Sequence, residues 1–154
     1  MRATALGIAI VVLTGVALAT PVGVVRLDPG GRLYPLADGE RYEYSYQQSI
    51  YQVPVIEEQV REGSALRIAR VRSRDRRAVE YFRWDGQIRF VGDEFVQDAP
   101  PNRVTTLAIR ITTEGAQRLH GAGFDIPLRS TFGEAIVTVA PVYVPLALVL
   151  LGTR

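Results

Sequence analysis

Residues 41–62 read RYEYSYQQSIYQVPVIEEQVRE, and this stretch decides the fold class of the chain. In its first half three tyrosines alternate with polar residues, the period of two expected of a strand with one aromatic and one polar face. The second half begins near Pro54, which cannot donate to a ladder and therefore suits the start of a strand. Residues 49–53 lack Gly, Asn and Asp, so we predict two strands joined by a bend or bulge rather than by a tight two-residue turn.

Turn sequences recur at short intervals along the rest of the chain. DPGG at residues 28–31 predicts a hairpin, because Pro presets φ and Gly accepts positive φ. Asp85-Gly86 is the strongest short hairpin signal and predicts a second hairpin with strands at residues 78–84 and 87–92. Further strands are expected at residues 65–73, 104–113, 117–120, 124–128 and 135–140, with a loop at residues 130–133.

These patterns place the chain in the all-β class. We expect about eight to ten antiparallel strands in a sandwich or partly open barrel, preceded by one N-terminal membrane helix. No stretch outside the N-terminal segment combines a 3.6-residue period with capping signals, so no other helix is predicted. A chain of 154 residues is long enough for one core, and we assign residues 24–140 to a single β domain.

The N-terminal segment is apolar. Residues 3–25 carry no charge and follow Arg2, which indicates a signal peptide or a membrane anchor over residues 1–23. Residues 17–19 (ALA) offer a small-residue cleavage site, whereas the length of the uncharged run fits a membrane span. Both alternatives export the rest of the chain, so we expect the β domain on the extracytoplasmic side of the cytoplasmic membrane.

The C-terminal segment is apolar as well, and residues 141–154 are assigned to a tail. The uncharged run over residues 135–151 has two interpretations. One is a final strand followed by a tail that contacts the membrane, and the other is a second membrane span. Pro141 and Pro145 argue against the span, because proline interrupts a helix.

Composition excludes several kinds of site. The absence of cysteine excludes disulfides, thiolate metal sites and a cysteine nucleophile. All 18 basic residues are arginine and the formal net charge is +2, so the charge balance does not demand a nucleic-acid partner. Asp93, Glu94 and Asp98 lack the spacing of a calcium loop, and we predict neither a metal nor another cofactor.

Six arginines crowd into residues 67–77. They form either a patch for anions or phospholipid headgroups, or a solvated strand end neutralised by nearby Asp75 and Glu80. Ile68 and Val71 lie between them and favour a half-buried strand, which is the second alternative. The six are Arg67, Arg70, Arg72, Arg74, Arg76 and Arg77.

Two short blocks carry a resemblance to a known family. Residues 46–50 (YQQSI) and 54–58 (PVIEE) resemble the "Y-x-H-S-V … T-P-V-x-E" signature of the domain of unknown function 1850 family. The likeness extends to the preceding hairpin and to residues 104–139, and so covers most of the chain after residue 22. Gln48 stands where the family usually has histidine, so a role that needs a titrating imidazole is not expected there.

The resemblance implies a cellular context. Members of the family are small exported or membrane-anchored proteins, commonly encoded beside TAXI-type TRAP transporters, which take up solutes with a periplasmic binding protein. It therefore implies a non-catalytic accessory or binding module at the outer face of the cytoplasmic membrane, with the membrane and TRAP transporter subunits as partners.

An enzyme is the alternative from a different class. A small extracytoplasmic hydrolase would use carboxylates, with Glu57 or Glu58 near another acid such as Asp93 or Asp98. Triad catalysis is not expected, since His120 is the only histidine and no G-x-S-x-G elbow occurs.

The candidate ligand or partner site lies in the opening stretch. Gln48 and Ser49 can each donate and accept hydrogen bonds, as a polar ligand requires, or can satisfy the backbone of a bulge. The three tyrosines share one strand face, so we expect them to be buried together or exposed together. At least one hydroxyl should reach solvent or a polar pocket lined by Gln48 or Glu57. The candidate residues are Tyr44, Tyr46, Gln48, Ser49, Pro54 and Glu57.

Overall fold

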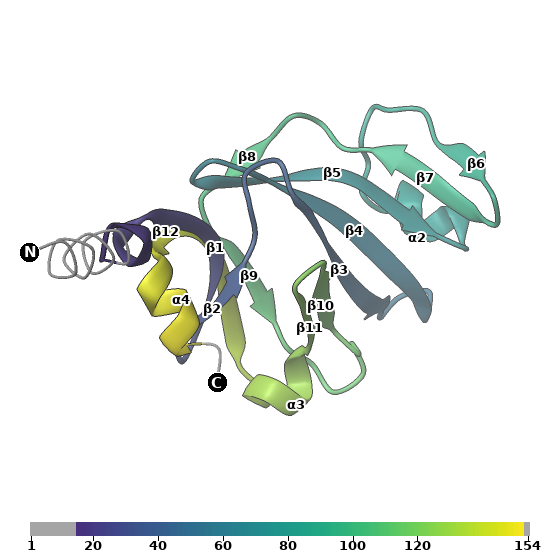
Figure 1. The fold of residues 1–154 in the computed structure, drawn as a ribbon. Helices are drawn as coiled ribbons and strands as arrows, with labels where there is room; N and C mark the ends of the chain where they lie inside the picture. The colour runs from purple at the N-terminus through teal and green to yellow at the C-terminus, as the bar shows by residue number, and fades with distance from the viewer. Residues whose placement is uncertain (1–14, 153–154) are drawn as a thin grey trace, which may run out of the picture.

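The computed structural model describes residues 15–152 and folds most of them into two open antiparallel sheets (Figure 1). The smaller sheet has four strands. Their order is β2 (Arg32–Pro35), β1 (Pro21–Asp28), β12 (Ile136–Pro145) and β9 (Leu107–Arg110).

The larger sheet has eight strands, seven of them in one continuous path. The path runs through β11 (Phe124–Pro127), β10 (Arg118–Gly121), β3 (Arg41–Gln48), β4 (Val53–Glu62), β5 (Ala65–Ser73), β7 (Glu94–Asp98) and β6 (Arg89–Val91). The two-residue strand β8 (Arg103–Val104) pairs with β5 off this path. The mostly-β class is thus confirmed, with more strands than the about eight to ten that turn signals predicted.

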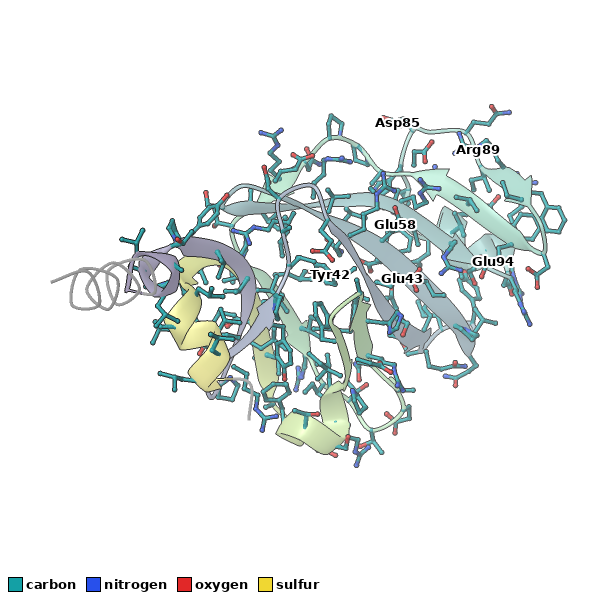
Figure 2. All side chains as sticks on the ribbon, in the orientation of Figure 1. Tyr42, Glu43, Glu58, Asp85, Arg89 and Glu94 are labelled. Atoms are coloured by element: carbon teal, nitrogen blue, oxygen red, sulfur yellow. The ribbon has the colours of Figure 1, made fainter. Side chains whose placement is uncertain are left out.

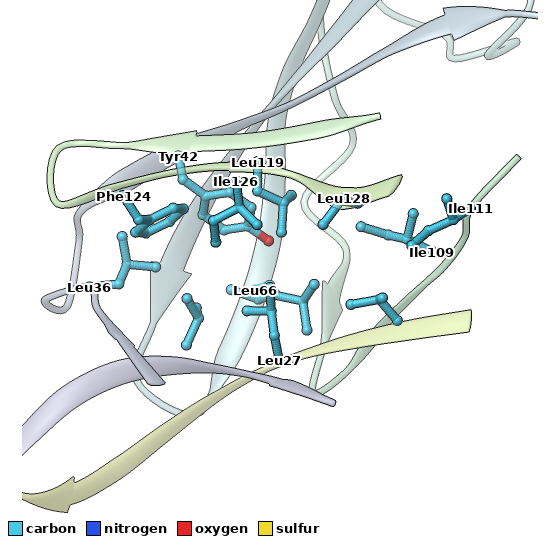
Figure 3. Packing of buried hydrophobic residues seen from close by; sticks show 13 residues of the cluster. Leu27, Leu36, Tyr42, Leu66, Ile109, Ile111, Leu119, Phe124, Ile126 and Leu128 are labelled. Carbon is cyan, nitrogen blue, oxygen red and sulfur yellow. The ribbon is translucent and has the colours of Figure 1, made fainter. Parts of the chain in front are cut away.

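The core joins the two sheets (Figure 3). The main cluster combines Leu27 and Val139 of the smaller sheet with Tyr42 and Leu66 of the larger one. Burying apolar side chains of both sheets together is what stabilises this packing. A second, smaller cluster, formed by Val55, Val71, Ala78 and Val79, lies under helix α2 (Arg76–Glu80). The larger sheet therefore has two differently covered regions on its inner face.

The predicted hairpin at residues 28–31 is confirmed. Strands β1 and β2 pair from Leu27 opposite Arg32, and Gly30 and Gly31 have φ values of 104° and 62°. These are left-handed backbone conformations that glycine adopts without a steric penalty. The strands predicted in the opening stretch are also confirmed, and β3 and β4 are joined by a four-residue turn from Gln48 to Val53 rather than by a bulge.

The two ends of the described chain lie side by side. Strand β1 pairs with β12 over the whole length of β1, from Pro21 opposite Pro145 to Asp28 opposite Thr138. The uncharged run over residues 3–25 is therefore not one helix, since it passes into a strand at Pro21. Strand β12 continues past residue 140, and helix α4 (Leu146–Gly152) follows it.

Most of the predicted N-terminal segment, residues 1–14, lies outside the described residues. Within residues 15–152, no helix combines the length and apolar character that crossing a bilayer requires.

The hairpin predicted around Asp85-Gly86 is wrong. Residues 76–80 form α2, which starts at Asp75, whose side chain accepts a hydrogen bond from the Arg77 amide. The hairpin in this region is β6–β7, and it turns at Gly92-Asp93, where Gly92 has a φ of 65°. The physical reason is burial, because the helix places Ala78 and Val79 together in the second cluster, whereas strand alternation would separate them.

The single strand predicted over residues 104–113 is also wrong. The chain leaves the larger sheet after β8 and enters the smaller sheet at β9, so residues 105–106 cross between the sheets. The predicted loop at residues 130–133 is mostly the helix α3 (Leu128–Phe132). Helices α2, α3 and α4 have only five, five and seven residues, too short for a 3.6-residue period to be recognised in the sequence.

Candidate functional site

The three tyrosines of β3 face inward in a row along the larger sheet. The register sets Tyr42 opposite Gln59, Tyr44 opposite Glu57 and Tyr46 opposite Val55 on β4. The Tyr44 and Tyr46 rings stack with centroids 5.0 Å apart and an interplanar angle of 28°. Alternation along the strand accounts for the shared face, as predicted.

Burial changes along this row, contrary to the expectation that the tyrosines are buried equally. Tyr42 is 1% exposed and belongs to the main cluster, where its ring centroid lies 6.1 Å from that of Phe124. Tyr44 and Tyr46 are only partly buried, and Tyr46 packs against the second cluster. The row therefore runs from the core between the sheets toward the part of the larger sheet that the smaller sheet does not cover (Figure 1).

Glu57 is the central polar residue of the inner face. It is 8% exposed, and burial raises its pKa from 4.5 to about 7, because a charge is costly away from water. A hydrogen bond with the Tyr46 hydroxyl favours the charged form and partly offsets this shift. The Tyr46 hydroxyl is therefore near Glu57. Burial and the Glu57 charge raise the pKa of both Tyr44 and Tyr46.

The hydroxyl of Tyr42 is different. It is buried and has no hydrogen-bond partner among the described residues, and Figure 3 shows it directed into the main cluster. Burial, together with the Glu57 charge, raises its pKa. A buried hydroxyl without a partner loses its bonds to water and gains none in return.

Two further polar residues of β4 continue the inner row and were missed by the sequence interpretation. Gln59 is 1% exposed and its Nε2 donates to Glu57 Oε2 at 3.3 Å. Arg61 is fully buried. Counting every second residue from Val55 passes through Glu57, Gln59 and Arg61, so strand alternation was the signal that could have found them.

Arg61 has no carboxylate partner within residues 15–152. Its guanidinium instead donates to the carbonyl oxygens of Leu36 at 2.6 Å, Gly63 at 2.9 Å, Val142 at 3.1 Å and Val24 at 3.4 Å. It also lies 4.5 Å from the centroid of the Tyr143 ring. Arg61 therefore connects the larger sheet to both central strands of the smaller one.

Gly23 makes room for this arrangement. A Cβ at Gly23 would lie 2.1 Å from Arg61 Nη1 and 2.8 Å from the Leu36 carbonyl oxygen. No side chain other than hydrogen fits there without displacing the guanidinium, so the glycine and the buried arginine form one structural unit.

The structure brings together some of the predicted site residues and separates others. Tyr44, Tyr46 and Glu57 meet on the inner face. Gln48 lies at the end of β3 and is 6% exposed, and its Oε1 has no hydrogen-bond partner among the described residues. Ser49 is exposed in the turn, and Pro54 has the opposite parity to Glu57 on β4. The accessory-module hypothesis predicts Gln48, Ser49 and Glu57 at one exposed surface, and that prediction is wrong, because Gln48 and Glu57 are buried and only Ser49 is exposed.

The outer face of the larger sheet carries a network of ion pairs, whose carboxylates Glu43, Glu58 and Glu94 are labelled in Figure 2. Glu58 contacts Arg41 and Arg70, while Arg72 bridges Glu43 and Glu94 at 2.6 Å and 2.8 Å. Each of the six arginines in residues 67–77 has a carboxylate partner; the remaining pairs are Arg67–Glu62, Arg74–Asp93, Arg76–Glu80 and Arg77–Asp75. This agrees with the neutralised strand end and leaves no free cationic patch in that segment.

The acids that the hydrolase alternative requires are engaged by other partners. Glu58 is held by two arginines, Asp93 by Arg74 and Asp98 by Arg89, while burial and Tyr46 account for the pKa of Glu57 without an acidic neighbour. His120 is exposed and lies 3.7 Å from Asp125. Within residues 15–152 there is also no group of three or more His, Cys, Asp or Glu side chains that could hold a metal ion.

Comparison with known proteins adds no relative to this description. Protein-family models, curated proteins and solved structures were each compared with the chain, and none of them matches it. The resemblance of residues 46–50 and 54–58 to the domain of unknown function 1850 family accordingly stays a hypothesis carried by those residues.

Proposed function

We propose that this protein is a non-catalytic accessory module seated at the outer face of the cytoplasmic membrane. The single observation that carries the proposal is that the first and last described residues of the chain meet at one apolar pole of the domain. In this arrangement the membrane anchor lies in the residues that precede strand β1 at Pro21, and the β domain lies on the extracytoplasmic side as a sandwich of the two sheets.

The apolar pole consists of residues 15–20, Tyr143 and helix α4. The amide of Leu146 donates to the carbonyl of Thr20 at 3.0 Å, so the two ends touch directly (Figure 1). Several large apolar side chains of this pole are exposed. The exposed ones are Val16, Leu18, Tyr143, Leu148, Leu150 and Leu151.

Exposed apolar side chains gathered at one place mark a surface that contacts a membrane or a protein. A membrane is favoured here because the pole includes the end of the uncharged N-terminal run. Tyrosine at its edge suits the interface between lipid and water, where amphipathic rings are enriched.

The chemistry of the domain supports an accessory role. The carboxylates of the outer face are engaged by arginines, and the structure brings no second acid to Glu57. The partner we propose is a TRAP-type solute transporter, on the basis of the family resemblance, and co-purification of its subunits with the tagged full-length protein would test that pairing.

The position of the pole can be tested with tryptophan fluorescence, because the chain has a single tryptophan, Trp84. The double variant Tyr143→Trp/Trp84→Phe moves this probe to the pole. In proteoliposomes made with brominated lipids, we expect strong quenching of the variant and little quenching of the wild type, which serves as the matched control. Equal quenching of the two proteins would contradict the proposed seating.

The side of the membrane can be tested separately, because the chain has no cysteine. Ser64 and Ala122 are exposed in turns, so Ser64→Cys and Ala122→Cys should not disturb the fold. We expect both to react with a maleimide that cannot cross the cytoplasmic membrane when it is added from the extracytoplasmic side. Labelling only after lysis would place the domain on the opposite side.

A further inference from the structure

A cavity of about 150 Å³ lies against the inner face of the larger sheet, beside the loop that crosses to the smaller sheet. Leu66 and Ile68 of β5 line it together with Trp84, Val104 and Leu107. The one polar side chain from the sheet is Gln59, which is 1% exposed and turns its amide nitrogen toward Glu57. A space of this volume is large enough for a group about the size of benzene. The cavity therefore suits an apolar group.

The cavity adjoins a wider surface hollow. Trp84, Ala99 and Pro100 line both, and the hollow has a volume of about 550 Å³. Its charged lining residues are Arg83, Asp85 and Asp98. A ligand can thus place an apolar group past Trp84 while its polar end remains in the hollow.

Two oppositely charged side chains in the hollow have no ion-pair partner within the described chain. Asp98 is bound to Arg89 at 2.8 Å. Arg83 and Asp85, in contrast, form no ion pair with any residue of the described chain, although most arginines of the larger sheet do. A free guanidinium binds a carboxylate and a free carboxylate binds an ammonium group, each through charge-assisted hydrogen bonds.

The segment that carries these two charges is held rigidly. Gln97, which is 2% exposed, donates through Nε2 to the carbonyl oxygens of Trp84 at 2.9 Å and Gly86 at 2.6 Å. A Cβ on Gly86 would lie 3.3 Å from the Asp98 carbonyl oxygen, so the segment packs closely on β7.

Arg83 itself is held in an unfavourable backbone conformation. Its φ is 53°, in the left-handed region that residues other than glycine rarely adopt. Strain of this kind is concentrated at binding sites, and pre-organisation of a site reduces the cost of binding.

We propose that this cavity and hollow bind an apolar α-amino acid. Its side chain enters the cavity beside Leu66 and Trp84, its carboxylate meets Arg83, and its ammonium group meets Asp85. The site is independent of the membrane seating, since none of these residues belongs to the apolar pole.

Trp84 makes binding directly measurable as a change in its fluorescence. The full-length protein in detergent micelles is titrated with L-leucine, with 4-methylpentanoate, which lacks the ammonium group, and with 3-methylbutylamine, which lacks the carboxylate. We expect saturable binding of L-leucine and binding at least about tenfold weaker for each analogue, the usual effect of one lost charge-assisted contact. Absence of saturable L-leucine binding, or equal binding of all three compounds, would overturn the proposal.

Variants locate the binding. Arg83→Gln and Asp85→Asn should each weaken L-leucine binding about tenfold, and Val104→Phe, which adds bulk from a partly exposed position, should weaken it further. The matched controls are Arg110→Gln and Glu114→Gln, exposed residues that line neither space and form no ion pair within residues 15–152. They should leave the dissociation constant unchanged. Equal losses in the controls and at Arg83 and Asp85 would place the ligand elsewhere.

Discussion

On the two faces of the larger sheet, two carboxylates that are adjacent in sequence have opposite environments. Glu58 points outward and is held between Arg41 and Arg70, with about a sixth of its side chain exposed (17%). Glu57 points inward, meets tyrosine and glutamine side chains, and has a pKa raised to about 7 by burial. One peptide bond separates the two, and strand alternation accounts for the whole difference.

The comparison shows that an inward charge is not neutralised simply because an opposite charge lies on the same strand. Arg61 is also inward, four residues from Glu57, but a strand rises about 3.3 Å per residue, which separates them by about 13 Å. Arg61 is therefore stabilised by carbonyl oxygens, and Glu57 by hydrogen bonds and by protonation. Substitutions on the two faces test this contrast.

The largest effect is expected at Arg61. Arg61→Met should lower the free energy of unfolding by about 4 kcal/mol, because several buried carbonyls lose a charged donor at once. Urea unfolding of the full-length protein measures it. Arg70→Met on the outer face is the matched control and should cost less than about 1 kcal/mol. Similar losses in the two variants would remove the distinction between the faces.

The next effect is a pH dependence that originates at Glu57. Its pKa is raised on folding from 4.5 to about 7, so between these values the folded state holds a proton that the unfolded state has released. The contribution of Glu57 to stability should therefore be greatest below about pH 4.5 and should fall by about 3 kcal/mol as the pH rises from 4.5 to 7. Unfolding free energies measured from pH 4.5 to 8 check the slope.

The control for this slope is Glu57→Gln, which keeps the shape of the side chain and removes its titration. Histidine side chains ordinarily titrate in the same range, so both proteins should carry His120→Gln. The slope between pH 4.5 and 7 should then disappear in the Glu57→Gln protein. A slope that persists would assign the pH dependence to other groups.

A smaller effect, of opposite sign for two neighbouring tyrosines, is expected on β3. Tyr42→Phe should stabilise the protein by about 1 kcal/mol, since it removes a buried hydroxyl without a partner in the described chain. Tyr44→Phe should cost about 1 kcal/mol, because the partly buried Tyr44 hydroxyl is near Gln117, whose influence lowers the pKa of this tyrosine. Thermal melts compare the two, and a loss of stability in Tyr42→Phe would mean that a bridging water satisfies its hydroxyl.

The smallest effect belongs to the outer face. Glu58→Gln should change the free energy of unfolding by less than about 1 kcal/mol, because its arginine partners are partly exposed and can be solvated. The change should shrink further when the salt concentration is raised from 0.05 to about 1 M. A salt-independent loss of several kcal/mol would show that Glu58 is as critical as the buried inner residues.

Local patterns predicted the strands that carry the inner row. Alternation identified β3, and Pro54 marked the start of β4 to within one residue, so Tyr44, Tyr46 and Glu57 could be proposed as neighbours. Alternation fails where a segment buries adjacent residues, as Ala78 and Val79 do in α2. It also fails where one apparent strand serves two sheets, as residues 104–113 do.

The environment of the site could not be predicted in the same way. The pKa of Glu57 depends on the side chains that cover it, and the cavity beside Gln59 is closed by Trp84 and Leu107, distant in sequence. Alternation places Gln59 and Arg61 on the same strand face as Glu57. Only the tertiary structure shows that Arg61 donates hydrogen bonds to the carbonyl oxygens of Val24 and Val142.

The pairing of β1 with β12 has a mechanical consequence. Pro21 and Pro145 lie at the same end of an antiparallel pair, so tension between the two chain ends opens this ladder like a zipper, one pair after another, instead of shearing it. Val24 and Val142 are register partners, and the guanidinium of Arg61 bonds to the carbonyls of both. When the two chain ends are pulled apart, separation of β1 from β12 would therefore have to break the hydrogen bonds of Arg61 before it reaches the core. These bonds are expected to provide much of the mechanical resistance of the domain.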